Sequence, residues 1–434
     1  MRMRWRMRIG AGVVSVCASV CTAVLLAGCT AAPDPAGSGG GGDAKNGDTA
    51  PLAGTGDAAR RPVPQGRGSR LPDDFNGDGH RDLVLNDLVK AADDSYGDDA
   101  GIGIVYGTGA GGSGASGTAR GSGGGTGTGR GSGAALDPAV RQILGPRTHG
   151  ARVGGTLPAA FDAMAACDLD KDGYGDLVIA TDPPYDGTGM PPVPLQLLFG
   201  GPSGLTGRAV VLRIPGQARF GNEWPDHPVC GDFDGDGSVD LAVTASAGRV
   251  SFLRGPFSRA GAPRSASAPV PGGGPALEAP APAADADGDG YDDLVYSARA
   301  HAPGTAARGA LLLGGPDGPG RAGGSYRFKA VGLPPAPALP NGKGGGESAT
   351  EVLVSADFTG DERPDLVTRT HRGETADVIA VYEGTGGGTA GADWADGGTG
   401  GETGGGTGGG KGGGTGGGFA DRPVLTFSTS LFLK

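Results

Sequence analysis

The chain has 434 residues, a formal net charge of −11 and 93 glycines. An acidic chain is a poor candidate for binding nucleic acid or an anionic lipid surface, because both repel negative charge. Much of the glycine lies in three tracts, at 37–42, 107–133 and 384–418. Such chain cannot bury enough apolar surface to offset the entropy lost on ordering, so we expect disorder there, with the last two tracts as inserts in a folded domain.

The N-terminus is typical of an export signal. Four arginines within the first eight residues precede an apolar stretch over 9–26, and Leu26-Ala27-Gly28-Cys29 follows. This tetrapeptide resembles the lipobox of bacterial lipoproteins, and the resemblance implies cleavage before Cys29 and lipidation of its sulfur. The alternatives are an ordinary signal peptide or an uncleaved anchor helix. We expect a signal peptide over 1–28, a flexible tether over 29–68 and a domain over 69–434, anchored at the extracellular face of the cell membrane.

A loop pattern, Asp-x-Asp-x-Asp-Gly-x-x-Asp-Leu, occurs five times along the rest of the chain. We number the loops 1 to 5 in chain order, and their positions from the first Asp. Positions 1, 3, 5, 7 and 9 hold Asp74, Asn76, Asp78, His80 and Asp82 in loop 1; Asp168, Asp170, Asp172, Tyr174 and Asp176 in loop 2; Asp232, Asp234, Asp236, Ser238 and Asp240 in loop 3; and Asp285, Asp287, Asp289, Tyr291 and Asp293 in loop 4. Loop 5 is less complete and keeps Asp357, Asp361 and Asp365 at positions 1, 5 and 9.

The loop pattern predicts binding of Ca²⁺, a hard cation that takes about six to eight oxygen ligands in forgiving geometry. Side chains at positions 1, 3 and 5 of a tight loop converge on one point, and the carboxylate at position 9 closes the cage. Position 7 offers its carbonyl oxygen, so its side chain is free to vary, as it does here. Glycine at position 6 permits a turn that a Cβ would obstruct.

An EF-hand is the rival interpretation, and two observations oppose it. The EF-hand loop needs a bidentate Glu at position 12 and flanking helices. Position 12 of the five loops holds Leu85, Ile179, Val243, Tyr296 and Thr368. The residues after position 9 are short, apolar and β-branched runs, which are typical of strands. The loops therefore join strands rather than helices.

A second repeated element follows each loop: an apolar run that ends in glycine, as in 195–200 or 311–314. Together the two elements resemble the FG-GAP repeat, also known as the VCBS-type or integrin-α N-terminal repeat. The resemblance implies an all-β fold, a β-propeller of four-stranded antiparallel blades with calcium-binding hairpin loops. The family usually has seven blades, whereas five repeats are recognisable here. In the second repeat we expect strands near 160–167, 177–181, 194–199 and 209–214.

Two cysteines, Cys167 and Cys230, remain outside the leader and the lipobox. They precede the first Asp of loops 2 and 3 by one and two residues. In strands this offset puts repeat-equivalent side chains on opposite faces, which favours two buried free thiols over the alternative, a disulfide between them.

The resemblance implies that the domain binds a ligand or partner rather than catalysing a reaction. We expect a monomeric adhesion, binding or scaffold module with a protein or glycan ligand at the cell envelope and no nucleic-acid ligand. Candidate contact residues are the aromatic side chains of Tyr96, Tyr185, Trp224 and Trp394. The sequence has none of the common hydrolase, metalloprotease or phosphate-loop motifs. The alternative is an extracellular carbohydrate-active enzyme or lyase that uses carboxylates of a central channel.

Overall fold

The computed structural model describes residues 60–88, 101–109, 136–219, 221, 224–270, 285, 287–297, 308–327, 350–371, 377–385 and 419–433. All of these belong to one unit that spans Ala50–Lys434. The expected signal peptide, Cys29, Tyr96, Trp394 and most of the glycine-rich tracts lie outside the described residues. Within them, no helix is long and apolar enough to cross a membrane.

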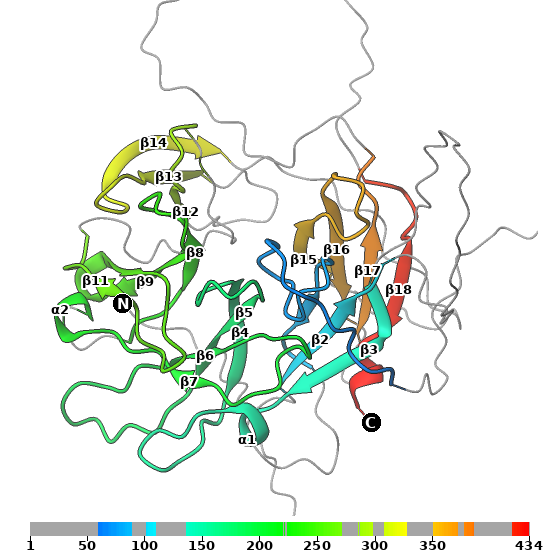
Figure 1. Cartoon of the computed structure of the whole chain (residues 1–434), viewed down its shortest axis with the longest axis horizontal. Coiled ribbons are helices and arrows are strands. Elements are labelled where there is room, and N and C mark those ends of the chain that lie inside the picture. The colour runs from blue at the N-terminus through cyan, green and yellow to red at the C-terminus, as the bar shows by residue number, and fades with distance from the viewer. Residues whose placement is uncertain are drawn as a thin grey trace, which may run out of the picture. The chain divides into compact units, whose positions relative to one another are not determined.

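The described residues form five antiparallel sheets, one for each repeat (Figure 1). Sheet 1 contains β1 (Leu83–Leu85), β2 (Ile102–Gly107) and β3 (Leu136–Leu144); sheet 2 contains β4 (Phe161–Cys167), β5 (Asp176–Thr181), β6 (Leu195–Leu198) and β7 (Val210–Val211); sheet 3 contains β8 (Val229–Gly231), β9 (Asp240–Ala245), β10 (Arg249–Arg254) and β11 (Ser265–Ala266). Sheet 4 contains β12 (Leu294–Ser297), β13 (Arg308–Leu313) and β14 (Arg321–Arg327); sheet 5 contains β15 (Thr350–Ala356), β16 (Asp365–Thr370), β17 (Val378–Tyr382) and β18 (Leu425–Ser428).

Each sheet is a meander in which strands adjacent in sequence are hydrogen-bonded neighbours. Among the described residues, four short helices lie outside the sheets: α1 (Pro146–His149), α2 (Gly216–Arg219), η1 (Ser246–Gly248) and η3 (Thr429–Phe432). The all-β prediction is confirmed, and sheets 2, 3 and 5 have the expected four strands. The strands of sheet 2 coincide with the ranges expected from the sequence to within a few residues.

Neighbouring sheets share hydrophobic cores. Core clusters join sheet 1 to sheet 2, sheet 2 to sheet 3, sheet 3 to sheet 4, and sheet 5 to sheet 1. In β5, Leu177 and Ile179 pack toward sheet 1 while Val178 packs toward sheet 3. Because both faces of such a strand are covered, its sequence is a continuous apolar run and does not alternate with polar residues.

Sheet 1 differs from sheets 2, 3 and 5 because no described strand precedes its loop. The segment before loop 1 makes one ladder-type hydrogen bond with the segment after it, from the Asp82 N–H to the Asp73 carbonyl. Pro72 then ends this pairing, because proline has no N–H to continue a ladder. Instead, the chain before Pro72 runs across loops 1 and 2. The N–H of Gly66 donates to the Asn76 carbonyl at 3.0 Å, and that of Ser69 to the Gly173 carbonyl at 2.7 Å. Residues 60–68, expected in the flexible tether, thus include part of the folded domain.

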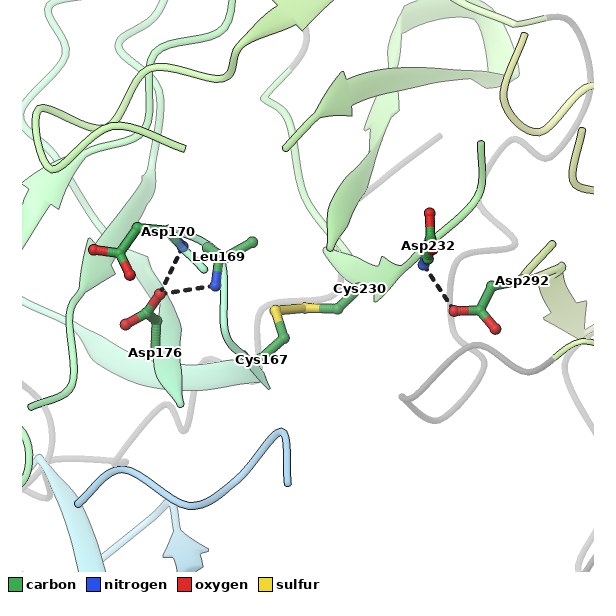
Figure 2. The surroundings of a disulfide bond; sticks show 7 residues. All are labelled: Cys167, Leu169, Asp170, Asp176, Cys230, Asp232 and Asp292. Atoms are coloured by element: carbon green, nitrogen blue, oxygen red, sulfur yellow. Dashed lines mark hydrogen bonds between the residues drawn. A yellow bond between two sulfur atoms is a disulfide. The ribbon is translucent and has the colours of Figure 1, made fainter. Parts of the chain in front are cut away.

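The disulfide Cys167–Cys230 links the starts of loops 2 and 3 (Figure 2). Its Cα atoms are 6.4 Å apart, and both residues are buried in the core between sheets 2 and 3. The prediction of two free thiols is therefore wrong. Where copies of one repeat stack, the front face of one sheet meets the back face of the next. Two side chains that meet between the sheets must therefore lie on opposite faces of their own repeats. The one-residue offset that argued against a bridge is what brings the sulfurs together.

We predict that replacing both cysteines, Cys167→Ala with Cys230→Ala, lowers the free energy of unfolding by about 4 kcal/mol. The bridge closes a segment with a sequence separation of 63 residues, and cross-links of this length restrict the unfolded chain by about that amount. Urea denaturation under oxidising conditions measures the difference. Under reducing conditions the wild type should lose most of its stability advantage over the double variant, because the bridge is then broken. A wild type that is equally stable under oxidising and reducing conditions would contradict the prediction.

Candidate metal centres in the repeat loops

The aspartate at position 1 shapes each loop by accepting backbone hydrogen bonds. In loop 1 the Asp74 carboxylate accepts from the N–H groups of Gly77, Asp78 and Gly79 at 2.7, 3.2 and 2.7 Å. Loops 4 and 5 repeat all three bonds, and loops 2 and 3 keep the bond from position 6. The carboxylate thus fixes the backbone turn before any ligand is considered.

Positive backbone φ angles occur at position 6, as expected, and also at position 4. Gly79 and Gly173 at position 6 both have φ of 89°, and Gly77 at position 4 has φ of 68°. This left-handed conformation favours glycine. Position 4 is glycine in loops 1, 3, 4 and 5, and Lys171 adopts the same conformation in loop 2, with φ of 61°. This second glycine position is visible in the sequence pattern.

The position-5 carboxylate accepts the N–H of position 7, at 2.9–3.1 Å in the five loops. The side chain at position 7 has a different role in two loops. The Tyr174 ring lies so close to loop 1 that a Cβ on Gly77 would be 2.6 Å from it, and Tyr291 lies similarly against Gly235 of loop 3. Position 7 therefore packs one loop against the preceding one, which also explains why a bulky residue is tolerated there.

The aspartate at position 9 joins the loop to the second repeated element. In loop 2 the buried Asp176 accepts the Leu169 N–H at 2.8 Å on one oxygen and the Gly200 N–H at 2.9 Å on the other. Loops 1 and 5 repeat both bonds, and loops 3 and 4 repeat the bond from the glycine. Each of these glycines ends the apolar run that follows its loop.

Those glycines have no room for a side chain. A Cβ on Gly107, Gly200, Gly255, Gly314 or Gly384 would lie 2.1–2.5 Å from the carbonyl oxygen at position 8 of its own loop. The glycine of the second element is therefore required by the same aspartate contact that closes the loop. The two repeated sequence elements form one structural unit.

The oxygen atoms that remain fit a hard cation. In loops 2 and 3, ligand atoms of positions 1, 3 and 9 lie within 4.8 Å of one another; in loop 4, those of positions 1, 3 and 5 do. Buried oxygens without a hydrogen-bond partner include Asn76 Oδ1, Asp170 Oδ1, Asp232 Oδ1, Asp234 Oδ1, Asp240 Oδ2 and Thr359 Oγ1. All six belong to positions 1, 3 or 9. A buried acceptor with no donor is costly, and a divalent cation at the convergence point would satisfy several at once.

The raised pKa values of the loop carboxylates also favour a bound cation. Burial, with a smaller contribution from neighbouring loop carboxylates, raises the pKa of Asp176 to about 8, that of Asp240 to about 7 and that of Asp170 to about 6. Burial also raises the pKa of Asp82 and Asp365. Clustered, desolvated carboxylates resist ionisation together, and a bound cation removes that resistance.

Loops 1 and 5 depart from the other three. Loop 1 has the neutral amide of Asn76 at position 3, which supplies an oxygen without charge. In loop 5, Thr359 takes position 3, and the Asp361 carboxylate is paired with the Arg363 guanidinium, whose Nε lies 2.7 Å away. Among the described residues, neither loop brings three acidic ligand groups together. Loop 5 is consequently the weakest candidate for a cation.

Of the aromatic residues proposed as contacts, Tyr185 and Trp224 pack edge to face, with ring centroids 6.0 Å apart. Tyr185 is partly exposed. This pair lies outside the five loops.

Comparison with known proteins agrees with the repeat unit. Residues 232–296, from position 1 of loop 3 to the strand after loop 4, match the family model described as an FG-GAP-like repeat. No curated protein matches the chain. This match supports the interpretation of the chain as an FG-GAP-type repeat protein, which its loop and glycine elements predicted.

We predict that Gly200→Ala destabilises the domain, because the new methyl group would lie 2.2 Å from the Gly175 carbonyl oxygen. Overpacking of this kind costs about 1–3 kcal/mol. Gly207→Ala, in the same connection, is the matched control, because a Cβ there meets nothing within 4 Å. Chemical denaturation of both variants measures the difference, and equal loss in the two would argue against the steric account.

Proposed function

We propose that this chain is a calcium-binding, lipid-anchored repeat protein of the cell surface, which acts as a binding, adhesion or scaffold module rather than as an enzyme. The observation that carries the proposal is the convergence of buried, unpartnered oxygens in loops 2 and 3. The family resemblance supports a binding role, since FG-GAP-type repeats are associated with partner recognition.

Calcium is the cation that best suits these ligands. All candidate side chains are carboxylates, an amide or a hydroxyl, and histidine and cysteine, which zinc and copper prefer, are absent from the convergent groups. Calcium tolerates irregular geometry and high ligand charge, whereas magnesium demands a near-ideal octahedron. When bound, the ion would neutralise the carboxylates of positions 1, 3 and either 5 or 9.

The protein's own residues give the loops a structural task. Loops 2, 3 and 5 lead into the second strand of their sheets, and loops 1 and 4 into the first described strand. Position 9 is already fixed to the next hairpin through its glycine. Successive loops are also bonded to each other: the Gly175 N–H donates to the Asp74 carbonyl at 2.8 Å, and the Asp292 N–H to the Asp232 carbonyl at 3.0 Å. A cation in one loop would therefore stiffen a row of loops, and such a rigid row is a suitable platform for a partner.

The closed propeller is part of the proposal. The core clusters support it, because they connect sheets 5, 1, 2, 3 and 4 in succession. Closing the ring requires sheet 4 to meet sheet 5. Radial packing of this kind protects the edges of short sheets.

The enzyme alternative has one observation in its favour, a cavity of about 780 Å³ lined by β1, β4 and β15. Its carboxylates include Asp87 and Glu351. However, the buried Arg369 guanidinium lies 3.7 Å from Glu351 and 4.0 Å from Asp87, so these acids are partnered. We therefore assign this cluster to the packing of sheet 5 against sheet 1.

We predict that calcium stabilises the domain and that chelation lowers its Tm. A ligand present at a hundredfold excess over its Kd contributes about 2.7 kcal/mol per site, so the loss should amount to several degrees. Differential scanning calorimetry at pH 8 with calcium and then with excess EGTA measures it, with magnesium added back as the control. A melt that chelation leaves unchanged would refute the calcium assignment.

Calorimetry at pH 6, compared with the measurement at pH 8, tests the raised pKa values of Asp176 and Asp240. The folded-state pKa values of Asp176 and Asp240 lie above the unfolded value of 3.8. The metal-free domain should therefore gain stability as pH falls from 8 through 7, where these groups take up protons only in the folded state. Calcium needs them ionised, so the stabilisation it gives should be smaller at pH 6 than at pH 8.

The lipid anchor has its own test. Cys29→Ser should move the protein from the membrane fraction to the soluble exported fraction, because one thioether carries the diacylglycerol. Fractionation of cells expressing each form, with a cytoplasmic marker as the control, distinguishes the two. An unchanged membrane association would favour an uncleaved anchor helix.

A further inference from the structure

One short connection carries two arginines that reach two different loops. Residues 258–264, between β10 and β11, form a turn closed by the Ser258 N–H, which donates to the Ala262 carbonyl at 2.8 Å. From this turn the Arg259 Nε lies 2.7 Å from an Asp170 oxygen, and its Nη2 pairs with Asp172 of loop 2. Arg264 pairs with Asp236 of loop 3. The guanidinium of Arg259 is further held over the Phe199 ring, 5.1 Å from its centroid.

In loops 2 and 3, both oxygens of the position-5 carboxylate are occupied, one by a backbone N–H and the other by an arginine. Asp172 accepts the Tyr174 N–H on Oδ1 and Arg259 on Oδ2. Asp236 likewise accepts the Ser238 N–H on Oδ1 and Arg264 on Oδ2. By contrast, position 3 keeps an oxygen available in each loop, because Oδ1 of Asp170 and of Asp234 is buried without a partner.

Within the described part of the chain, no arginine pairs with the position-5 carboxylate of loop 4. Its convergent group contains position 5, Asp289, together with Asp285 and Asp287. Arg321 lies 3.9 Å from Asp287 at position 3. In loops 2 and 3, the convergent groups contain positions 1, 3 and 9 and omit position 5. Arginines also contact position 3 in these loops, Arg259 at Asp170 and Arg254 at Asp234, but only through Oδ2. Position 5, with an arginine on one oxygen and a backbone N–H on the other, is the carboxylate missing from the cation ligands.

We infer that Arg259 and Arg264 are affinity-determining residues, which compete with calcium for the position-5 carboxylates of loops 2 and 3. This inference rests on the proposed calcium function. It predicts two classes of site: loop 4, with position 5 available, binds calcium more tightly than loops 2 and 3. One turn of the chain sets the affinity of two neighbouring loops.

The competition is weak enough for calcium to win at sufficient concentration. The side chains of Arg259 and Arg264 are 56% and 47% exposed, and ion pairs at such exposure are readily broken. Removing an arginine frees one ligand and also removes a positive charge close to the incoming ion. Both effects have the same sign, so binding should tighten by about threefold to tenfold.

The test uses the whole exported chain and the metal alone. Terbium luminescence sensitised by Tyr174 reports loops 1 and 2, because the ring belongs to loop 2 and lies against Gly77 of loop 1. Tyr174→Phe identifies this signal and Asp170→Asn removes the contribution of loop 2; calcium competition then gives the affinity. Arg259→Gln should tighten calcium binding at loop 2, and calorimetry should show the same for Arg264→Gln at loop 3. Arg152→Gln, which changes the net charge equally and donates only to the Gly155 carbonyl, should leave both affinities unchanged.

A second substitution separates competition from positioning. Asp172→Asn should have little effect in the wild type but should abolish the gain in the Arg259→Gln background, whereas Asp289→Asn should weaken loop 4 directly. If Arg259 instead orients the ligands, Arg259→Gln will weaken binding, and that result or an unchanged affinity overturns the inference while calcium binding itself survives. A wild-type chain that binds no calcium overturns the proposed function as well.

Discussion

The contact between the position-9 aspartate and the glycine of the following hairpin is the interaction on which each repeat depends. Asp176, for example, receives one backbone N–H from its own loop and another from Gly200. A carboxylate held between two N–H groups fixes the distance between the loop and the next hairpin. Because the same glycine leaves no space for a Cβ, the two repeated elements of each repeat arise from one physical constraint.

Stacking of the sheets accounts for features that an isolated sheet would not show. Strands such as β5 and β16 are buried on both faces, so they consist largely of apolar runs, and the charged residues within them have hydrogen-bond or ion-pair partners. Arg369 in β16 is such a case, with Asp377 within 3.5 Å of its Nε. The disulfide follows the same geometry, since it bridges facing surfaces of two stacked sheets.

Much of this fold was predictable from the sequence, because five copies of one loop reveal the strands on either side of it. The pairing of Cys167 with Cys230 was not, since alternation along a strand says nothing about which face meets the neighbouring sheet. The roles of Arg259 and Arg264 were also hidden: their partners Asp172 and Asp236 lie 87 and 28 residues away in sequence. Pro72 and the course of 60–70 depend on contacts with two separate loops, which no local pattern encodes.

The path of residues 66–69 has a mechanical consequence. Arg61 is bonded to Ala139 of β3, Gly66 to loop 1 and Ser69 to loop 2, so tension applied to the N-terminal side of the chain first loads the edge of β3 and then these two loops. Once the bond to β3 breaks, the load falls on a few backbone bonds at the aspartate-rich turns. A ligand that stiffens those turns therefore also raises the force needed to pull the domain open.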